Sequence, residues 1–177
     1  MRLFIAINLD ESIKEELLMI ISRLKKLSRQ GSYTFPENLH LTLLFLGEVQ
    51  ESEINRIKMA MDETKAAPFQ LQFSGLVNFK RKEGDIYWIG VNNNKMLDDI
   101  HRQLFSNLNQ AGFHLENRPF KPHLTIGRRV ITRQEFDMAD FSQRILPMKM
   151  ETGKISLMKS ERINGKLTYT EIYSKHY

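Results

Sequence analysis

Two short segments of the sequence share one arrangement of polar residues. They read ENLHLTLLFLGE and RPFKPHLTIGRR, and each contains His-Leu-Thr followed by an aliphatic residue. The chain has five histidines, and two of them, His40 and His123, occupy this frame. Because side chains alternate between the two faces of a strand, His40 shares a face with Thr42, and His123 shares one with Thr125. Two such strands lying side by side would bring two imidazoles and two hydroxyls to one cleft.

Two convergent imidazoles can perform acid–base chemistry on a phosphodiester. One ring takes a proton from the attacking water or hydroxyl, and the other gives a proton to the leaving oxygen; each transfer contributes roughly 10²–10⁴ in rate. An unperturbed histidine pKa of about 6.5 lets both protonation states coexist near neutral pH. The hydroxyls of Thr42 and Thr125 can donate hydrogen bonds to non-bridging phosphate oxygens. This scheme requires no metal, and we expect neither a metal nor another cofactor.

Metal ligation is the main rival use for these two histidines. Two imidazoles alone are an incomplete ligand set, and no His-x-His pair accompanies them. The lack of cysteine excludes disulfides, thiolate catalysis, zinc–thiolate sites and iron–sulfur clusters. The sequence also has no Gly-x-Ser-x-Gly elbow, Walker loop or Gly-x-Gly-x-x-Gly motif. The pattern therefore favours metal-free acid–base chemistry.

Composition and charge narrow the class of protein further. A chain of 177 residues suits one domain, or two small lobes that share a core. Its net charge of +5 favours an anionic partner such as a nucleic acid, a nucleotide or an acidic membrane surface. No apolar run reaches the ~18 residues of a membrane span, and the first one is broken at Asn8 and Asp10. We expect a cytoplasmic protein that does not enter a membrane.

Helices and strands are mixed along the chain. Helical spacing of apolar residues predicts helices over residues 11–27, 51–65 and 95–109, the first capped by Asp10 and the third burying Met96, Ile100, Leu104 and Leu108. Apolar runs predict strands over residues 2–9, 39–46, 69–79, 85–91 and 123–128. The segment SRQGSY is expected to be a break after the first helix, and a short helical turn is expected over residues 134–141.

The C-terminal part of the chain predicts antiparallel pairing. Strands are expected over residues 148–151, 154–160 and 166–173, and the INGK segment between the last two contains Asn-Gly, a strong hairpin signal. Helices combined with an antiparallel hairpin favour an α+β fold over a doubly wound parallel sheet. The repeated tetrapeptide, each copy in a strand–helix–strand context, favours a two-lobed arrangement with approximate internal symmetry.

The two His-Leu-Thr segments resemble the signature segments of the 2H phosphoesterases, and most of all the prokaryotic RNA 2′,3′-cyclic phosphodiesterases, also called 2′-5′ RNA ligases. The opening RLFIAINL, the IYWIGV strand and the final Tyr-Thr strand fit the same family. The resemblance covers nearly the whole chain. It implies a single domain over residues 1–177, built of two interleaved lobes about a pseudo-twofold axis. Two antiparallel sheets would line a central cleft, with the helices outside.

The resemblance also implies an activity and a role for each matching residue. The implied reaction is metal-independent hydrolysis of a terminal RNA 2′,3′-cyclic phosphate to a 2′-phosphomonoester. His123 would activate water, His40 would protonate the 3′-oxygen, and Thr42, Thr125 and Arg128 would bind the phosphate. The expected partners are RNA ends or small cyclic-phosphate nucleotides, bound by a monomer. Two alternatives stay open, namely 2′-5′ RNA ligation as the physiological reaction and a non-catalytic RNA- or nucleotide-binding module.

Strand parity and family resemblance disagree about the phosphate-binding arginine. On a regular strand, Arg129 shares a face with His123, and Arg128 points away. The resemblance selects Arg128, which would require a bulge at Gly127 or an end of the strand there. Guanidinium suits the role because it binds phosphate through two parallel hydrogen bonds. An aromatic side chain that stacks on the terminal base is also expected, although the sequence does not identify it.

Overall fold

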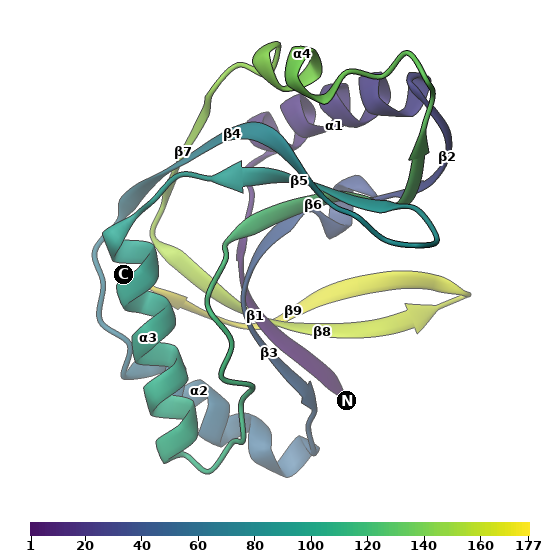
Figure 1. Ribbon diagram of the computed structural model, residues 1–177. Helices are drawn as coiled ribbons and strands as arrows, with labels where there is room; N and C mark the ends of the chain where they lie inside the picture. Colours follow the sequence, from purple (N-terminus) through teal and green to yellow (C-terminus); the bar gives the residue numbers. More distant parts are fainter.

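The computed structural model describes residues 1–177 and contains two antiparallel sheets with helices around them (Figure 1). The strands are β1 (Arg2–Asn8), β2 (Ser28–Tyr33), β3 (His40–Glu48), β4 (Phe69–Phe79), β5 (Asp85–Val91), β6 (His123–Thr132), β7 (Met148–Thr152), β8 (Lys154–Ile163) and β9 (Lys166–His176). The helices are α1 (Glu11–Lys26), α2 (Ile54–Asp62), α3 (Lys95–Gln110) and α4 (Met138–Gln143), with short 3₁₀ turns η1 (Pro36–Asn38) and η2 (Glu51–Glu53).

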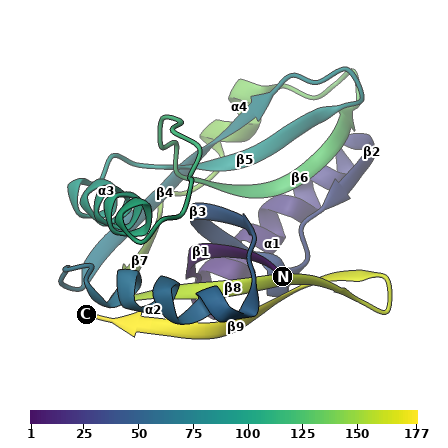
Figure 2. The ribbon, with the colours of Figure 1, turned by 90° about the horizontal axis from the view of Figure 1, so that it is seen from below.

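The first sheet has the strand order β3-β1-β8-β9, and the second has the order β2-β6-β5-β4-β7. Every strand pair in both sheets is antiparallel. Figure 2 shows the sheets as two layers, with α1 and α3 on opposite sides of the molecule. The α+β prediction is confirmed, and so is the prediction of two antiparallel sheets. None of the helices combines the length and apolar character that crossing a bilayer requires.

Both sheets contribute to one hydrophobic core of 35 buried residues. Helix α1 follows a strand of the first sheet but packs against β6 and β7 of the second. Helix α3 follows a strand of the second sheet but packs against β3 of the first. Because each helix links one sheet to the other, we propose that residues 1–177 form a single domain of two interleaved lobes.

The two long helices begin at side-chain caps and bury one face. Asp10 accepts a hydrogen bond from the backbone N–H of Ile13 at 3.0 Å, which satisfies one of the free donors at the start of α1. Asn94 does the same for Leu97 in α3, also at 3.0 Å. The predicted stripe of α3 was wrong at one position, because Leu97 is buried where Met96 was expected. The predicted turn over residues 134–141 lies later, as helix α4.

The segment SRQGSY is a strand, β2, where a break was predicted. Ser, Gln and Gly have low intrinsic strand propensity, so pairing with a neighbour decides the structure here. Strand β2 pairs along β6, with Ser32 opposite Arg128 and Tyr33 opposite Gly127. The chain then leaves this edge of the sheet beside the second His-Leu-Thr segment.

The predicted C-terminal hairpin is confirmed. Strands β8 and β9 are joined by Asn164 and Gly165, whose φ angles are 50° and 79°. Two consecutive left-handed residues define the tight turn that matches the twist of a hairpin, and they explain the Asn-Gly pair. The hairpin extends beyond the rest of the first sheet (Figure 1).

Candidate active site

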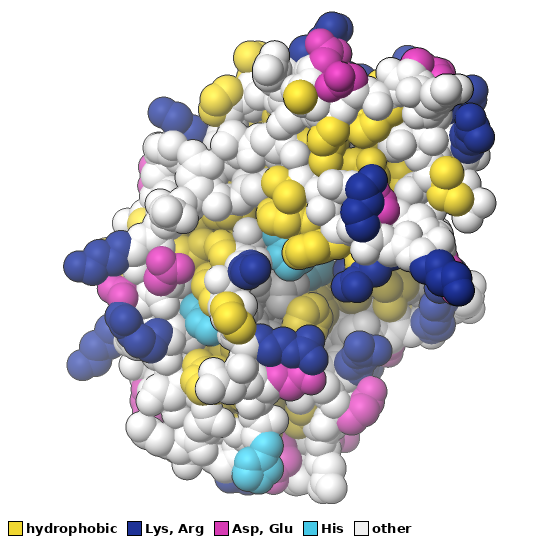
Figure 3. All heavy atoms as spheres, in the orientation of Figure 1, with side chains coloured by type: hydrophobic (Ala, Val, Ile, Leu, Met, Phe, Trp, Pro, Cys, Tyr) yellow, Lys and Arg dark blue, Asp and Glu magenta, His cyan; other side chains and the backbone are white.

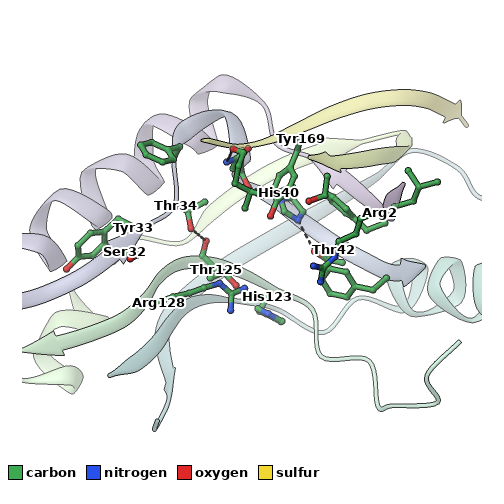
Figure 4. A pocket seen from close by; sticks show the side chains of 17 residues that line it. Arg2, Ser32, Tyr33, Thr34, His40, Thr42, His123, Thr125, Arg128 and Tyr169 are labelled. Carbon is green, nitrogen blue, oxygen red and sulfur yellow. Dashed lines mark hydrogen bonds between the residues drawn. The ribbon is translucent and has the colours of Figure 1, made fainter. Parts of the chain in front are cut away.

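A cleft of about 570 Å³ lies between the two sheets, and all five predicted site residues line it: His40, Thr42, His123, Thr125 and Arg128. Strand β3 carries the first His-Leu-Thr segment in one sheet, and β6 carries the second in the other. The two strands are therefore not hydrogen-bonded neighbours, as a side-by-side pair would be, but face each other across the junction of the sheets. Figure 4 shows the two histidines on opposite walls.

His40 is held in one tautomer by the backbone. Its Nδ1 lies 2.8 Å from the carbonyl oxygen of Asn38, and because a carbonyl can only accept, Nδ1 carries the proton. The neutral ring thus leaves Nε2 as an acceptor, and Thr42 Oγ1 lies 2.9 Å from it, positioned to donate (Figure 4). Phe4 packs at 4.8 Å from the ring and Tyr169 at 5.1 Å, measured between ring centroids. These contacts fix the plane of the imidazole.

The surroundings of His40 favour its neutral form. Burial lowers the pKa of His40 below the ordinary histidine value, while the hydrogen bond to Asn38 opposes that shift. The guanidinium of Arg128 and the nearby ring of His123 lower this pKa further. Cations thus gather in the cleft without a compensating anion, which is the electrostatic condition for binding a phosphate. Arg2 adds a further cationic side chain to the same lining.

His123 repeats the geometry of His40. Its Nδ1 lies 2.7 Å from the carbonyl oxygen of Lys121, again two residues upstream, so Nδ1 is the donor and Nε2 is left for the cleft. The edge of Trp88 packs against this ring at 5.3 Å, and Phe79 stacks on Trp88 at 5.5 Å. Trp88 lies opposite Thr125 on β5, so it supports the ring of His123 from the same face of the sheet.

A β-bulge decides which arginine enters the cleft. Trp88 lies opposite Thr125 on the neighbouring strand, but Tyr87 lies opposite Gly127, so one residue of β6 is extra. Two consecutive residues, Ile126 and Gly127, are buried as a result. The alternation then restarts one position later, and Arg128 joins Thr125 on the cleft side. Regular parity was wrong for Arg129, and a bulge places Arg128 as the resemblance required.

Gly127 is needed at this bulge because of space. A Cβ atom at this position would lie 2.9 Å from Cγ2 of Val130 and 3.3 Å from Cδ1 of Tyr33. The first distance would force the Val130 side chain to shift and the second is tighter than ordinary contact, so glycine suits the close approach of β2 to the bulge. The following residue, Arg129, has a left-handed backbone with φ 53°.

The first His-Leu-Thr strand contains the same irregularity at the same place. Ala6 lies opposite Thr42 and Ile5 opposite Leu44, so β3 also has one extra residue directly after its threonine. The burial sequences of β3 and β6 agree over their first six residues. Phe45 consequently occupies in β3 the position that Arg128 occupies in β6, and it lines the cleft while 67% exposed.

Several further lining residues were not predicted. They come from β1, from the segment after β2, and from β9: Arg2, Thr34, Phe35 and Tyr169. Thr34 links the segment after β2 to β6, since its Oγ1 donates to the carbonyl oxygen of Thr125 at 2.9 Å (Figure 4). Only the Tyr-Thr pair in β9 gave a signal in the sequence, through the family resemblance. The others depend on how distant strands pair.

The two sheets and the paired His-x-Thr strands confirm the resemblance to the 2H phosphoesterases. The chain belongs to the 2′-5′ RNA ligase superfamily, whose family model matches residues 9–164. An RNA 2′,3′-cyclic phosphodiesterase of Archaeoglobus fulgidus is 36% identical over 145 residues, which span 81% of this chain and 80% of that protein. One of Methanothermobacter thermautotrophicus is 31% identical over 177 residues, 97% of this chain and 96% of that one.

Solved structures share the fold. Escherichia coli LigT complexed with 3′-AMP superimposes with a TM-score of 0.81 at 24% identity, covering 99% of this chain and 97% of that chain. A protein of Thermus thermophilus superimposes with a TM-score of 0.79 at 23% identity, covering 99% of this chain and 97% of that chain. The two-sheet architecture is therefore shared across nearly the full length of these chains.

Proposed function

We propose that this protein hydrolyses the terminal 2′,3′-cyclic phosphate of RNA to a 2′-phosphomonoester. One observation carries the proposal. His40 and His123 approach one cleft from opposite sheets, each with Nδ1 bound to a carbonyl two residues upstream, so that Nε2 is the nitrogen left for chemistry; Nε2 of His40 lies 2.9 Å from Thr42 Oγ1 in the free protein. Arg128, Thr42 and Thr125 line the same cleft. The names of the relatives from Archaeoglobus fulgidus and Methanothermobacter thermautotrophicus support this substrate.

The proposed reaction needs two proton transfers and no cofactor. Nε2 of His123 takes a proton from water as the water oxygen attacks phosphorus. The bond between phosphorus and O3′ breaks, and Nε2 of His40 gives a proton to that oxygen, which leaves the phosphate on O2′. Arg128 and the two threonine hydroxyls hold the non-bridging oxygens, where they stabilise the charge that grows in the transition state. His123 then releases a proton to solvent and His40 takes one up, which restores both rings.

If His40 is the general acid, its ring must be protonated when the substrate is bound. In the free protein, burial and the nearby cations favour the neutral ring. A bound phosphate anion opposes the repulsion from Arg128, and therefore favours the protonated ring of His40. The substrate would in this way help to charge its own general acid.

This charging can be measured by titrating the His40 ring by NMR. In the free protein we expect a midpoint below the ordinary histidine value of about 6.5. Inorganic phosphate should move the midpoint to higher pH, because an anion stabilises the protonated form. The profile of kcat/KM against pH should be bell-shaped, rising with loss of the base proton and falling with loss of the acid proton. A His40 midpoint that phosphate leaves unmoved would contradict the proposed role.

Phe45 is proposed as the stacking partner of the terminal base. It occupies the position equivalent to Arg128 on the opposite wall of the cleft, and its ring is mostly exposed. An exposed aromatic face beside a phosphate site suits an unpaired base, and such stacking is worth about 1–3 kcal/mol per base. Phe4, by contrast, is buried under His40 and serves to position it.

The proposed activity is tested with an RNA oligonucleotide that ends in a 2′,3′-cyclic phosphate, in the presence of EDTA. We expect a 2′-phosphate product at an unchanged rate when the chelator is added. No turnover, or turnover that needs an added metal, would refute the proposal. Including an RNA with a free 5′-hydroxyl tests ligation in the same tube, because that hydroxyl can replace water as the nucleophile. Tight RNA binding without any product would favour a binding module.

A further inference from the structure

A second hollow, of about 440 Å³, lies directly beside the cleft. Four cationic side chains line it, namely Arg81, Lys82, Arg128 and Arg129, which we call the basic shelf. Arg128 lines both hollows, so the shelf adjoins the cleft at this residue. Figure 3 shows Lys and Arg side chains around the central hollow, most densely on the right, where the β4–β5 turn lies in Figure 1.

The shelf is built by packing the β4–β5 turn onto the end of β6. Gly84 has φ 105°, and a Cβ atom there would lie 2.6 Å from the carbonyl carbon of Arg129. The backbone of Arg129 is itself left-handed, at φ 53°. Asp85 holds the turn from inside, accepting from the Asn78 side chain at 2.6 Å and from the backbone N–H of Arg81 at 3.2 Å. These contacts hold the backbone that carries the four cationic side chains.

The charges of the shelf are not neutralised within the protein. Asp85 pairs with Lys80 at 3.2 Å, outside the shelf, and none of the four shelf cations forms a salt bridge. Glu83 is the one carboxylate in the lining. Four cations around one small hollow repel each other unless an anion lies among them. Arginine and lysine side chains at such spacing are suited to phosphate.

We propose that the basic shelf binds the phosphodiester next to the terminal nucleotide of an RNA strand whose cyclic phosphate lies in the cleft. This inference rests on the proposed function, and it adds the direction in which the strand leaves the site. Arg128 has five N–H donors, so it can contact the terminal phosphate and still face the shelf. A strand that continues over the β4–β5 turn thereby meets Arg81 and Lys82. The protein should prefer oligonucleotide ends to cyclic-phosphate mononucleotides, which lack the second phosphate.

The test compares two substrates with the double variant Arg81→Ala, Lys82→Ala. One substrate is a nucleoside 2′,3′-cyclic phosphate, and the other is a trinucleotide ending in the same nucleotide. The wild-type kcat/KM should be higher for the trinucleotide, and the variant should reduce this advantage about tenfold. The dependence of log kcat/KM on log salt for the trinucleotide should also become shallower, by about 0.7 per lost phosphate contact.

The matched control is Lys95→Ala with Lys149→Ala, which removes the same charge from exposed positions on α3 and β7. This control should keep the trinucleotide advantage, which separates the shelf from a general effect of net charge. An unchanged substrate ratio in the shelf variant would overturn the proposal, and so would equal losses on both substrates. If the wild type hydrolyses neither substrate, the proposed function fails instead. Binding of a labelled 2′-phosphorylated trinucleotide, lost or kept in the shelf variant, then decides for or against the shelf.

Discussion

Alanine at His40 or at His123 is expected to reduce kcat by about 10²–10⁴-fold in either case. Each substitution removes one of the two proton transfers while leaving Arg128 and the threonines to bind the phosphate. The two losses should not multiply, because acid and base act in one step, and the double variant should resemble the worse single one. Alanine at His114, an exposed histidine away from the cleft lining, serves as the control.

The two histidines can be told apart by the leaving group. An aryl phosphodiester whose leaving group needs no proton should restore most of the loss in the variant that lacks the acid. It should restore little in the variant that lacks the base. We expect His40→Ala to be the variant that recovers. Recovery of His123→Ala instead would exchange the two roles, and full activity of both variants on the RNA substrate would remove the acid–base proposal.

Removal of the Arg128 guanidinium should have the second largest effect. Arg128→Ala is expected to lower kcat/KM for a cyclic-phosphate mononucleotide by about 10²–10³-fold, the usual cost of losing a donor aimed at developing charge. Arg128→Lys should recover only part of this activity, because an ammonium group cannot make two parallel contacts with phosphate. The kinetics of Arg128→Ala, Arg128→Lys and Arg129→Ala, measured side by side, provide the check.

Comparison of the two arginines tests the bulge directly. Arg129 does not line the cleft, so Arg129→Ala should lose much less on the mononucleotide than Arg128→Ala. Arg133→Ala, exposed just beyond the end of β6, controls for the loss of one positive charge near the site. A larger loss at Arg129 than at Arg128 would mean that regular strand parity, and not the bulge, describes the working site.

The site was predictable from the sequence as far as strand alternation holds. Leu41 and Leu124 are buried. The histidine before each leucine and the threonine after it point toward the cleft, as a period of two requires. Alternation alone fails at the bulge in β6, where it points to Arg129 while the family resemblance selects Arg128. A bulge is a property of two paired strands, so β6 alone could not reveal that Arg128 would be selected.

The unpredicted parts of the fold have the same origin. Apart from Tyr33, strand β2 has no β-branched or aromatic residue, and it exists because β6 offers an edge to pair with. Phe45 enters the cleft only because β3 has its own bulge against β1. Helices α1 and α3, in contrast, were predictable because their caps and buried faces are local features of the sequence.

The matching bulges in β3 and β6 have a consequence for how a ligand is oriented. Two walls with the same histidine, threonine and bulge would accept a cyclic phosphate equally well in two poses related by a half-turn. In one of those poses the acid and base would face the wrong oxygens. The residue after each bulge removes this ambiguity, because one wall presents the aromatic ring of Phe45 and the other the guanidinium of Arg128. This difference between the halves would give a cleft with otherwise similar walls one productive direction.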